Sequence, residues 1–202
     1  MNGHIRPEID WSDINTENVE HISTANDLPN PESGTITLEN KVYKFDGFVT
    51  LSDNLDISNS PAFVGNHGGA DGVIYTGAGD LLTGTDGAFF ARDVTFSAPG
   101  GTMFNISGDQ TTEILVESCN FADVANLGDI ANLGTITGFR VPSFKGCNFE
   151  NFGAGLTFDG TPDKIFFSEC PFRGVSNSNV TILTFPSTLT TDIVDITDCY
   201  IK

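Results

Sequence analysis

Apolar residues recur along the second half of the chain in one short pattern. Two apolar positions separated by one residue are followed by two variable residues, a Cys or Val, one further residue, and a Phe or Ile. Four copies occupy residues 89–96, 114–121, 165–172 and 194–201. A weaker copy is recognisable at residues 144–149, and Pro142 takes the first apolar position of this copy. The last apolar residues are Phe96, Phe121, Phe149, Phe172 and Ile201, so the steps between copies are 25, 28, 23 and 29 residues. Repeats of this length indicate units that bury their apolar faces by stacking on one another.

The repeating unit is predicted to consist of β-strands. Alternating apolar residues, then a break and one more inward pair, are typical of a strand, a corner and a second strand. The return segments 97–106 and 177–185 contain turn residues followed by β-branched and aromatic residues, without a sustained 3.6-residue period. A leucine-rich repeat is the alternative, but its return is usually helical. The sequence therefore predicts an all-β fold, a single-stranded right-handed parallel β-helix.

The predicted β-helix covers residues 34–202 and follows an extended acidic N-terminal arm at 1–33. It opens with an alternating strand at 34–38 and continues at 42–45 and 48–51. At roughly 27 residues per coil, its 169 residues make about six coils. The 17 Phe residues supply a core, with Phe96, Phe121, Phe149, Phe172 and Ile201 as a ladder in successive coils.

The four cysteines share one phase of the repeat, two residues before the ladder. They are Cys119, Cys147, Cys170 and Cys199, and Val94 holds the same phase one coil earlier. A position that accepts Val or Cys is a small apolar site, so buried free thiols are expected. Disulfides between coils are the alternative, because neighbouring parallel strands lie about 4.8 Å apart. The spacing lacks the close pairs of a zinc site.

The arm is the predicted attachment segment. Seven acidic residues in 1–33 face a single basic residue, Arg6. Its apolar residues Trp11, Ile14, Val19 and Ile22 are the candidate partner-docking residues, since Trp is a typical interface anchor. A poorly ordered terminus is the alternative.

Charge and composition restrict the partners. The net charge of −18, with nine Lys and Arg residues, argues against nucleic acid and anionic membranes. A surface suited to high salt and docking to a basic partner both remain as explanations of the acidity. The first residues contain no apolar signal-peptide core and no stretch is long enough to span a membrane, so synthesis in a host cytoplasm without a signal peptide is expected.

Candidate chemistry is sparse. Corner acids such as Asp46, Asp53, Asp109 and Asp163 are predicted to bond their own backbone, and no carboxylate pair with a nearby base stands out. No catalytic residue, cofactor or metal site is therefore assigned. A polysaccharide lyase or hydrolase remains an alternative. A calcium ion held among residues 69–72, Asp80 and residues 86–87 is a further alternative.

Two regions resemble a known family. Residues 24–29 followed by 34–40 look like the entry into β-helix proteins of tailed bacteriophages, and 156–160 with 165–170 are similar to their later coils. The resemblance covers roughly 22–202 and implies a pectin-lyase-like β-helix in a virion protein of the tailspike or fibre kind, commonly homotrimeric. The chain lacks the long groove-bearing solenoid and C-terminal trimerisation domain of tailspikes, which favours a structural or decoration role.

The expected function is a non-enzymatic structural protein of a phage particle. Its expected partners are two further copies in a homotrimer and other virion structural proteins. A tailspike-type module that binds or depolymerises a host surface glycan is the alternative, and a bacterial surface-binding module is a third. The final strand at 192–202 exposes unpaired backbone groups at the end of the predicted solenoid, which is expected to be covered by other chains.

Overall fold

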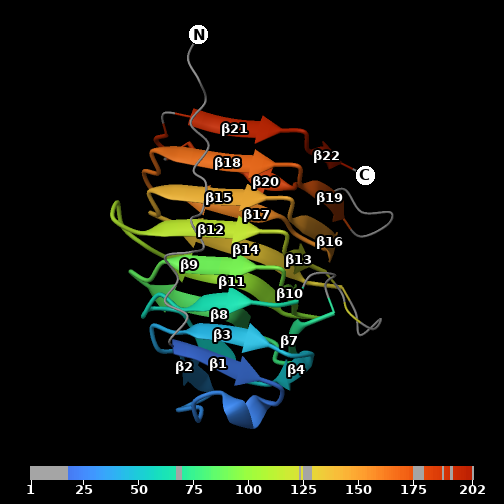
Figure 1. Cartoon of the computed structure of the whole chain (residues 1–202). Helices are drawn as coiled ribbons and strands as arrows, with labels where there is room; N and C mark the ends of the chain where they lie inside the picture. The colour runs from blue at the N-terminus through green and yellow to red at the C-terminus, as the bar shows by residue number, and fades with distance from the viewer. Residues whose placement is uncertain are drawn as a thin grey trace.

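Each copy of the sequence repeat supplies one strand to each of two sheets, and the return segment supplies a third. The computed structural model describes residues 18–66, 70–122, 124, 129–174, 180–187, 189–191 and 193–201. These residues form a parallel β-solenoid of about six turns, so the all-β solenoid predicted from the sequence is confirmed. Figure 1 shows the turns stacked in chain order, with β1 at one end and β21 at the other.

Three parallel sheets form the walls of the solenoid. Sheet A contains β1 (Val19–Ile22), β3 (Val42–Phe45), β6 (Ala62–Val64), β9 (Phe89–Arg92), β12 (Glu113–Glu117), β15 (Val141–Lys145), β18 (Lys164–Ser168) and β21 (Ile193–Thr197). Sheet B contains β2 (Thr35–Thr37), β5 (Asn54–Asp56), β8 (Asp80–Thr85), β11 (Thr102–Ser107), β14 (Asn132–Thr137), β17 (Leu156–Asp159) and β20 (Leu183–Thr184). Sheet C contains β4 (Phe48–Leu51), β7 (Gly72–Tyr75), β10 (Thr95–Ser97), β13 (Asn120–Phe121), β16 (Asn148–Phe152), β19 (Pro171–Gly174) and β22 (Tyr200–Ile201). Because the return segments form strands of sheet B, the leucine-rich repeat alternative is wrong.

The strand register reproduces the alignment of the sequence copies. In sheet C, Phe96 pairs with Phe121, Phe121 with Phe149, Phe149 with Phe172, and Phe172 with Ile201. In sheet A, Ile114 pairs with Pro142, which is the position assigned to Pro142 in the weaker copy. Steps of unequal length therefore differ in the loops between strands, apart from one register shift between Glu150 and Phe152 in β16.

The core is a column of stacked aromatic rings inside the three sheets. The ring centroids of Phe96 and Phe121 are 5.6 Å apart, those of Phe121 and Phe149 are 4.9 Å apart, and those of Phe149 and Phe172 are 4.8 Å apart. All four rings are almost fully buried. Each such ring contributes roughly 1.5–3 kcal/mol by leaving water. The four Phe residues of the predicted ladder are confirmed, whereas Ile201 has the right register but is 71% exposed.

A left-handed residue turns the chain from sheet A to sheet C in five successive turns. These residues are Asp93, Ser118, Gly146, Glu169 and Asp198, with φ angles of 57°, 54°, 62°, 58° and 53°. Each comes directly before the Val or Cys of the repeat. Left-handed backbone is unfavourable for residues other than Gly. The corner nevertheless keeps its ladder of hydrogen bonds, for example from Ser118 N–H to Lys145 O at 2.9 Å.

The predicted boundary at residue 34 needs correction, because the solenoid begins at Val19. Strand β1 pairs with β3 over its whole length and adds a rung to sheet A. Ile22 is fully buried, and Leu28, which follows the short 3-10 helix η3 (Ala25–Asp27), is 5% exposed. The acidic residues at 17, 20, 27 and 32 and the prolines at 29 and 31 obscured this strand in the sequence. The sequence signal for strand β1 was Ile22, an apolar residue that aligns with the core residue Phe45 of the next strand in sheet A.

Candidate functional site

A shallow polar groove lies on the outer face of sheet B. Its volume is about 420 Å³, and its lining residues come from four neighbouring strands and one corner. The lining residues are Thr35, Asn54, Asp56, Ser58, Thr83, Gly84, Thr85, Asn105 and Ser107. The inward partners of these positions, such as Leu55 and Ile106, are buried in the core. Strand alternation thus places hydroxyl, amide and carboxylate groups together on the outer face.

Hydrogen bonds join the groove residues across successive turns. Thr35 Oγ1 donates to Asn54 Oδ1 at 3.0 Å, and Asn54 Nδ2 donates to Thr83 Oγ1 at 2.8 Å. Asp56 accepts bonds from the backbone N–H and the hydroxyl of Ser58 at 3.0 and 2.5 Å. One oxygen of this carboxylate is therefore already occupied by local donors, and the other polar groups of the groove are hydroxyls and amides.

The groove was not predicted from the sequence. Its signal is alternation of polar residues with apolar ones, as in Thr35-Ile36-Thr37 and Asn105-Ile106-Ser107. Such alternation also describes any solvated strand, and Thr is a common strand former. The register that brings the polar residues of different turns together depends on loop lengths, which the local pattern does not reveal.

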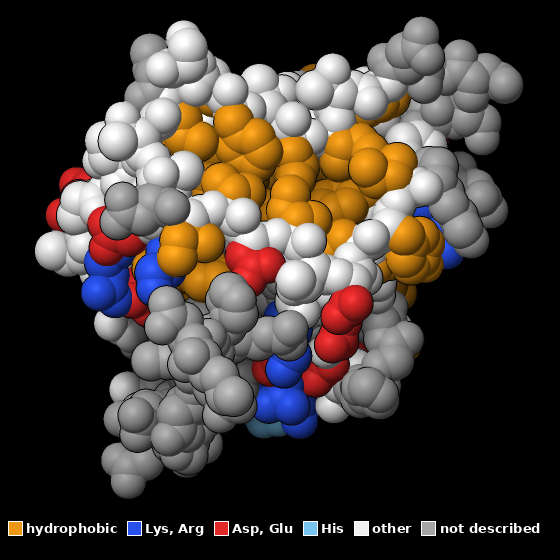
Figure 2. All heavy atoms as spheres, turned by 90° about the horizontal axis from the view of Figure 1, so that it is seen from above, with side chains coloured by type: hydrophobic (Ala, Val, Ile, Leu, Met, Phe, Trp, Pro, Cys, Tyr) orange, Lys and Arg blue, Asp and Glu red, His pale blue; other side chains and the backbone are white. Residues whose placement is uncertain are grey.

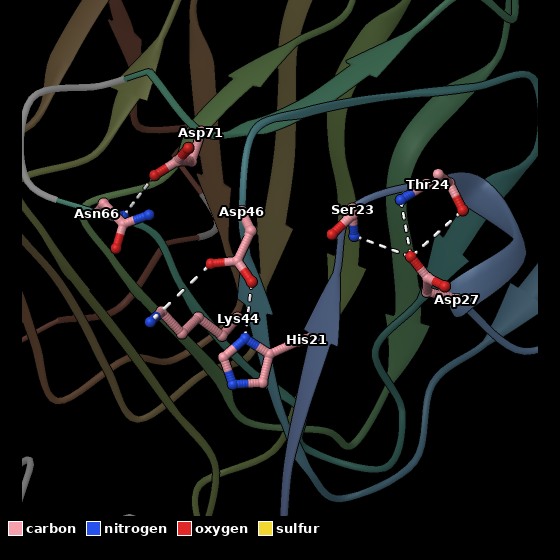
Figure 3. A network of polar contacts seen from close by, with 8 residues as sticks. All are labelled: His21, Ser23, Thr24, Asp27, Lys44, Asp46, Asn66 and Asp71. Carbon is pink, nitrogen blue, oxygen red and sulfur yellow. Dashed lines mark hydrogen bonds and ion pairs between the residues drawn. The ribbon is translucent and has the colours of Figure 1, made fainter.

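A second polar network lies near the first turn. His21 Nδ1 is 2.7 Å from Asp46 Oδ2, and Lys44 Nζ is 3.9 Å from Asp46 Oδ1 (Figure 3). The hydrogen bond with His21 is the main reason why the pKa of the Asp46 carboxyl is lowered from its usual value. In the same view, the Asn66 backbone N–H donates to Asp71 Oδ2 at 2.7 Å. The contact between His21 and Asp46 fastens β1 to the corner that follows β3.

Two corner acids, Asp109 and Asp159, bond nearby backbone as predicted, whereas Asp46 is bound by His21 instead. Asp109 accepts bonds from the N–H and hydroxyl of Thr111, and these bonds lower its pKa. Asp159 Oδ1 accepts from the Gly160 N–H at 2.8 Å. Asp53 accepts from the Ser52 hydroxyl, so it follows the same local behaviour. These acids act as caps of turns.

Two basic residues on or next to the strands of sheet A are engaged in ion pairs. Arg140 pairs with Glu113, and Lys145 Nζ is 3.4 Å from Glu117 Oε1. Within the described part of the chain, no group of three or more His, Cys, Asp or Glu residues is arranged to hold a metal ion. Among the residues considered for calcium, Gly69 lies outside the described residues and Asp71 is bound to Asn66.

Three of the four cysteines lie inside the solenoid, and all four are free thiols. Cys119, Cys147 and Cys170 are fully buried, whereas Cys199 is only partly buried. Burial raises the pKa of the Cys119 thiol to about 12 and raises that of Cys147 as well. Thiols with raised pKa values are poor nucleophiles. The prediction of buried free thiols is therefore confirmed for three of them and corrected for Cys199, which belongs to the last turn.

Of the four predicted docking residues, the structure describes Val19 and Ile22. Trp11 and Ile14 lie outside the described residues. Ile22 is fully buried beneath β1, so it would have to leave the core to contact a partner. Val19 is half-buried on β1 and pairs with Val42. The assignment of Ile22 to docking is therefore wrong, because its side chain completes the first turn of the core.

The last turn presents an apolar surface. Figure 2 looks onto this end of the solenoid, where hydrophobic side chains gather in a broad patch. The exposed apolar residues of β21 and β22 are Ile193, Val194, Ile196, Tyr200 and Ile201, with exposed fractions of 40%, 42%, 47%, 45% and 71%. Phe185, which stacks on Phe158 at 5.9 Å, is 38% exposed. Contiguous apolar patches of this kind mark sites of contact with other chains or segments.

Comparison with known proteins does not identify the chain. No family model, no curated protein and no solved structure matches it. No helix of the described residues is long and apolar enough to cross a membrane. The class that the geometry defines is therefore a parallel β-solenoid.

Proposed function

We propose that this chain is a non-enzymatic structural protein of a bacteriophage particle, such as a decoration protein, fibre or spike. In this proposal it forms a homotrimer that is attached to other virion proteins through its N-terminal segment, which in the isolated chain is free to bind elsewhere. The apolar surface of the last turn is the observation that carries the assembly part. The resemblance of residues 24–40 and 156–170 to phage β-helix proteins supports the location on a virion.

The local chemistry agrees with a structural role. In the polar groove, Asp56 is held by Ser58, and the Asn105 amide donates to Asp80 Oδ2 at 2.7 Å. These carboxylates therefore serve as hydrogen-bond acceptors within the wall of the solenoid.

Purified particles provide the test. If the gene is expressed from its native genome, washed phage particles should contain the chain in a fixed copy number that is a multiple of three, measured by quantitative mass spectrometry. Averaged cryo-EM maps of these particles should contain the stacked β-solenoid. Particles that lose the chain on washing, or contain none, would contradict the proposed location.

A glycan-binding module is the second candidate, and the groove on sheet B favours it. Its hydroxyl and amide groups suit the hydroxyls of a neutral sugar. Calorimetric titration with host surface polysaccharide should give a binding signal that is lost in Asn54→Ala and kept in Thr135→Ala, a variant of the same sheet outside the groove. Absence of binding, or equal loss in both variants, would remove this candidate.

A further inference from the structure

An outward apolar column runs along sheet A. Strand pairing aligns Val19, Val42, Ala62, Phe90 and Leu115 in five successive strands. Their neighbours along the strands, such as Tyr43 and Val116, point into the core, so the column faces outward. It continues through Ser143 to Phe166. We call this set of seven residues the sheet A column.

The sheet A column is poorly exposed although it faces away from the core. Val42, Ala62 and Leu115 are only 7%, 6% and 9% exposed, and none of them belongs to the continuous cluster of core residues. On the outer face of sheet B the corresponding positions are polar, for example Thr83 and Thr135. A sheet face that carries apolar rather than polar outward residues needs a cover.

The basic residues of this acidic chain gather around the same face. Six of the nine Lys and Arg residues lie on strands of sheet A or directly before them. They are Lys41, Lys44, Arg92, Arg140, Lys145 and Lys164. Several pair with acids of the same sheet, so the face is near neutral in a chain with a net charge of −18. An acidic segment is repelled less here than elsewhere on the molecule.

The sequence before β1 has the composition that fits this face. Residues 1–17 contain the acids Glu8, Asp10, Asp13 and Glu17, and the apolar residues Ile5, Ile9, Trp11 and Ile14. The segment joins the solenoid at Asn18, beside Val19, which is the first member of the column. Seven steps of about 4.8 Å separate the eight strands of sheet A, or about 34 Å. Seventeen extended residues reach up to about 56 Å, so the segment is long enough to follow the column.

We propose that residues 1–17 bind the outer face of sheet A of their own chain. Their apolar side chains cover the sheet A column, and their carboxylates lie near Arg92 and Lys145. Covalent attachment favours the same chain over a second copy, because a short tether gives an effective concentration in the mM range. The proposal concerns the isolated chain and does not rest on a role in a phage particle.

Trp11 is the only Trp in the chain, so its fluorescence reports on this contact alone. In the full-length protein we expect blue-shifted emission and weak quenching by acrylamide. Leu115→Asp should shift the emission to the red and raise the quenching constant several-fold, because it places a charge in the column and repels the acidic segment. The matched control, Thr135→Asp, puts the same charge on the outer face of sheet B and should leave the signal unchanged.

Further measurements separate the outcomes. The side chain of Lys145 is 54% exposed, so Lys145→Glu should raise the quenching of Trp11 without loss of the fold. This variant replaces Leu115→Asp in the test if Leu115→Asp does not fold. The signal should not change on dilution. Water-exposed Trp11 emission in the unaltered protein would overturn the proposal. Equal effects of Leu115→Asp and Thr135→Asp would also overturn it. A signal lost on dilution would show that the segment binds a second copy and would refute binding within one chain.

Discussion

At the scale of single residues, the repeat owes its stability to rings that lie directly above one another. Phe121 contacts Phe96 on one side and Phe149 on the other, with centroid distances of 5.6 and 4.9 Å. Strands hydrogen-bonded on both sides cannot move to fill a gap. Phe121→Ala should therefore reduce the free energy of unfolding by about 3–5 kcal/mol. Urea unfolding would measure this, with Phe48→Ala as control, because Phe48 is on the outer face of sheet C and 37% exposed. A loss below about 1 kcal/mol for Phe121→Ala would contradict the ladder.

The thiols allow a test of depth within the solenoid. Labelling of the native protein at mildly alkaline pH should modify Cys199 first and Cys119 and Cys147 last, because Cys199 is only partly buried whereas the other two are fully buried. Unfolding should make all four equally reactive, as mass spectrometry of the labelled peptides would show. Fast labelling of Cys119 in the native state would contradict this assignment. A disulfide found in protein prepared without reductant would also contradict it.

The contact between His21 and Asp46 predicts a pH effect. The Asp46 pKa is lowered in the folded state, so this contact stabilises the fold above pH 3.8, the usual value, and the stabilisation is lost as pH falls through the folded pKa. His21→Ala should raise the Asp46 pKa toward 3.8, which NMR titration of the carboxyl carbon would detect. Asp27 is the control, since its lowered pKa comes from the N–H groups of Ser23 and Thr24. An unchanged Asp46 pKa would show that His21 is not its donor.

At the scale of elements, the corner between sheets A and C repeats one backbone conformation with different residues. Gly146 has φ of 62°, and a Cβ there would meet no atom closer than 3.8 Å, so Gly146→Ala tests the backbone alone. It should destabilise the fold by about 1 kcal/mol. Glu169→Gly, at the equivalent corner with φ of 58°, should stabilise it by a few tenths to about 1 kcal/mol. Thermal unfolding would compare the two, and effects of the same sign would contradict a shared left-handed corner.

The elements also show how far sequence patterns reach. The copies at 89–96 through 194–201 predicted the strands of sheets A and C and their register, because inward positions in a stack must be apolar in every turn. Strand β1 was assigned to the arm because it is flanked by acids and has one core residue, Ile22. The groove on sheet B was missed for a related reason. Packing does not restrict the identity of polar residues that face outward. Which of them lie side by side depends on the strand register, and the register is known only once the turns are stacked.

At the scale of the whole molecule, charge and apolar surface have opposite effects on assembly. Copies with a net charge of −18 repel one another, whereas the last turn exposes apolar side chains that association would bury. Salt shortens the range of the repulsion, to about 10 Å at 0.1 M and about 3 Å at 1 M. The proposed homotrimer should therefore become tighter as salt rises, since burial of apolar surface is not weakened by screening.

Light scattering and native mass spectrometry across a salt series would measure this effect. Ile196→Asp should weaken the trimer, because Ile196 is 47% exposed in the middle of β21. Thr135→Asp, on the outer face of sheet B in β14, adds the same charge two strands before the last strand β20 and should not. A trimer that dissociates with salt would indicate contacts between opposite charges. A monomer at every salt concentration would exclude self-association through the last turn and leave that surface to a different chain.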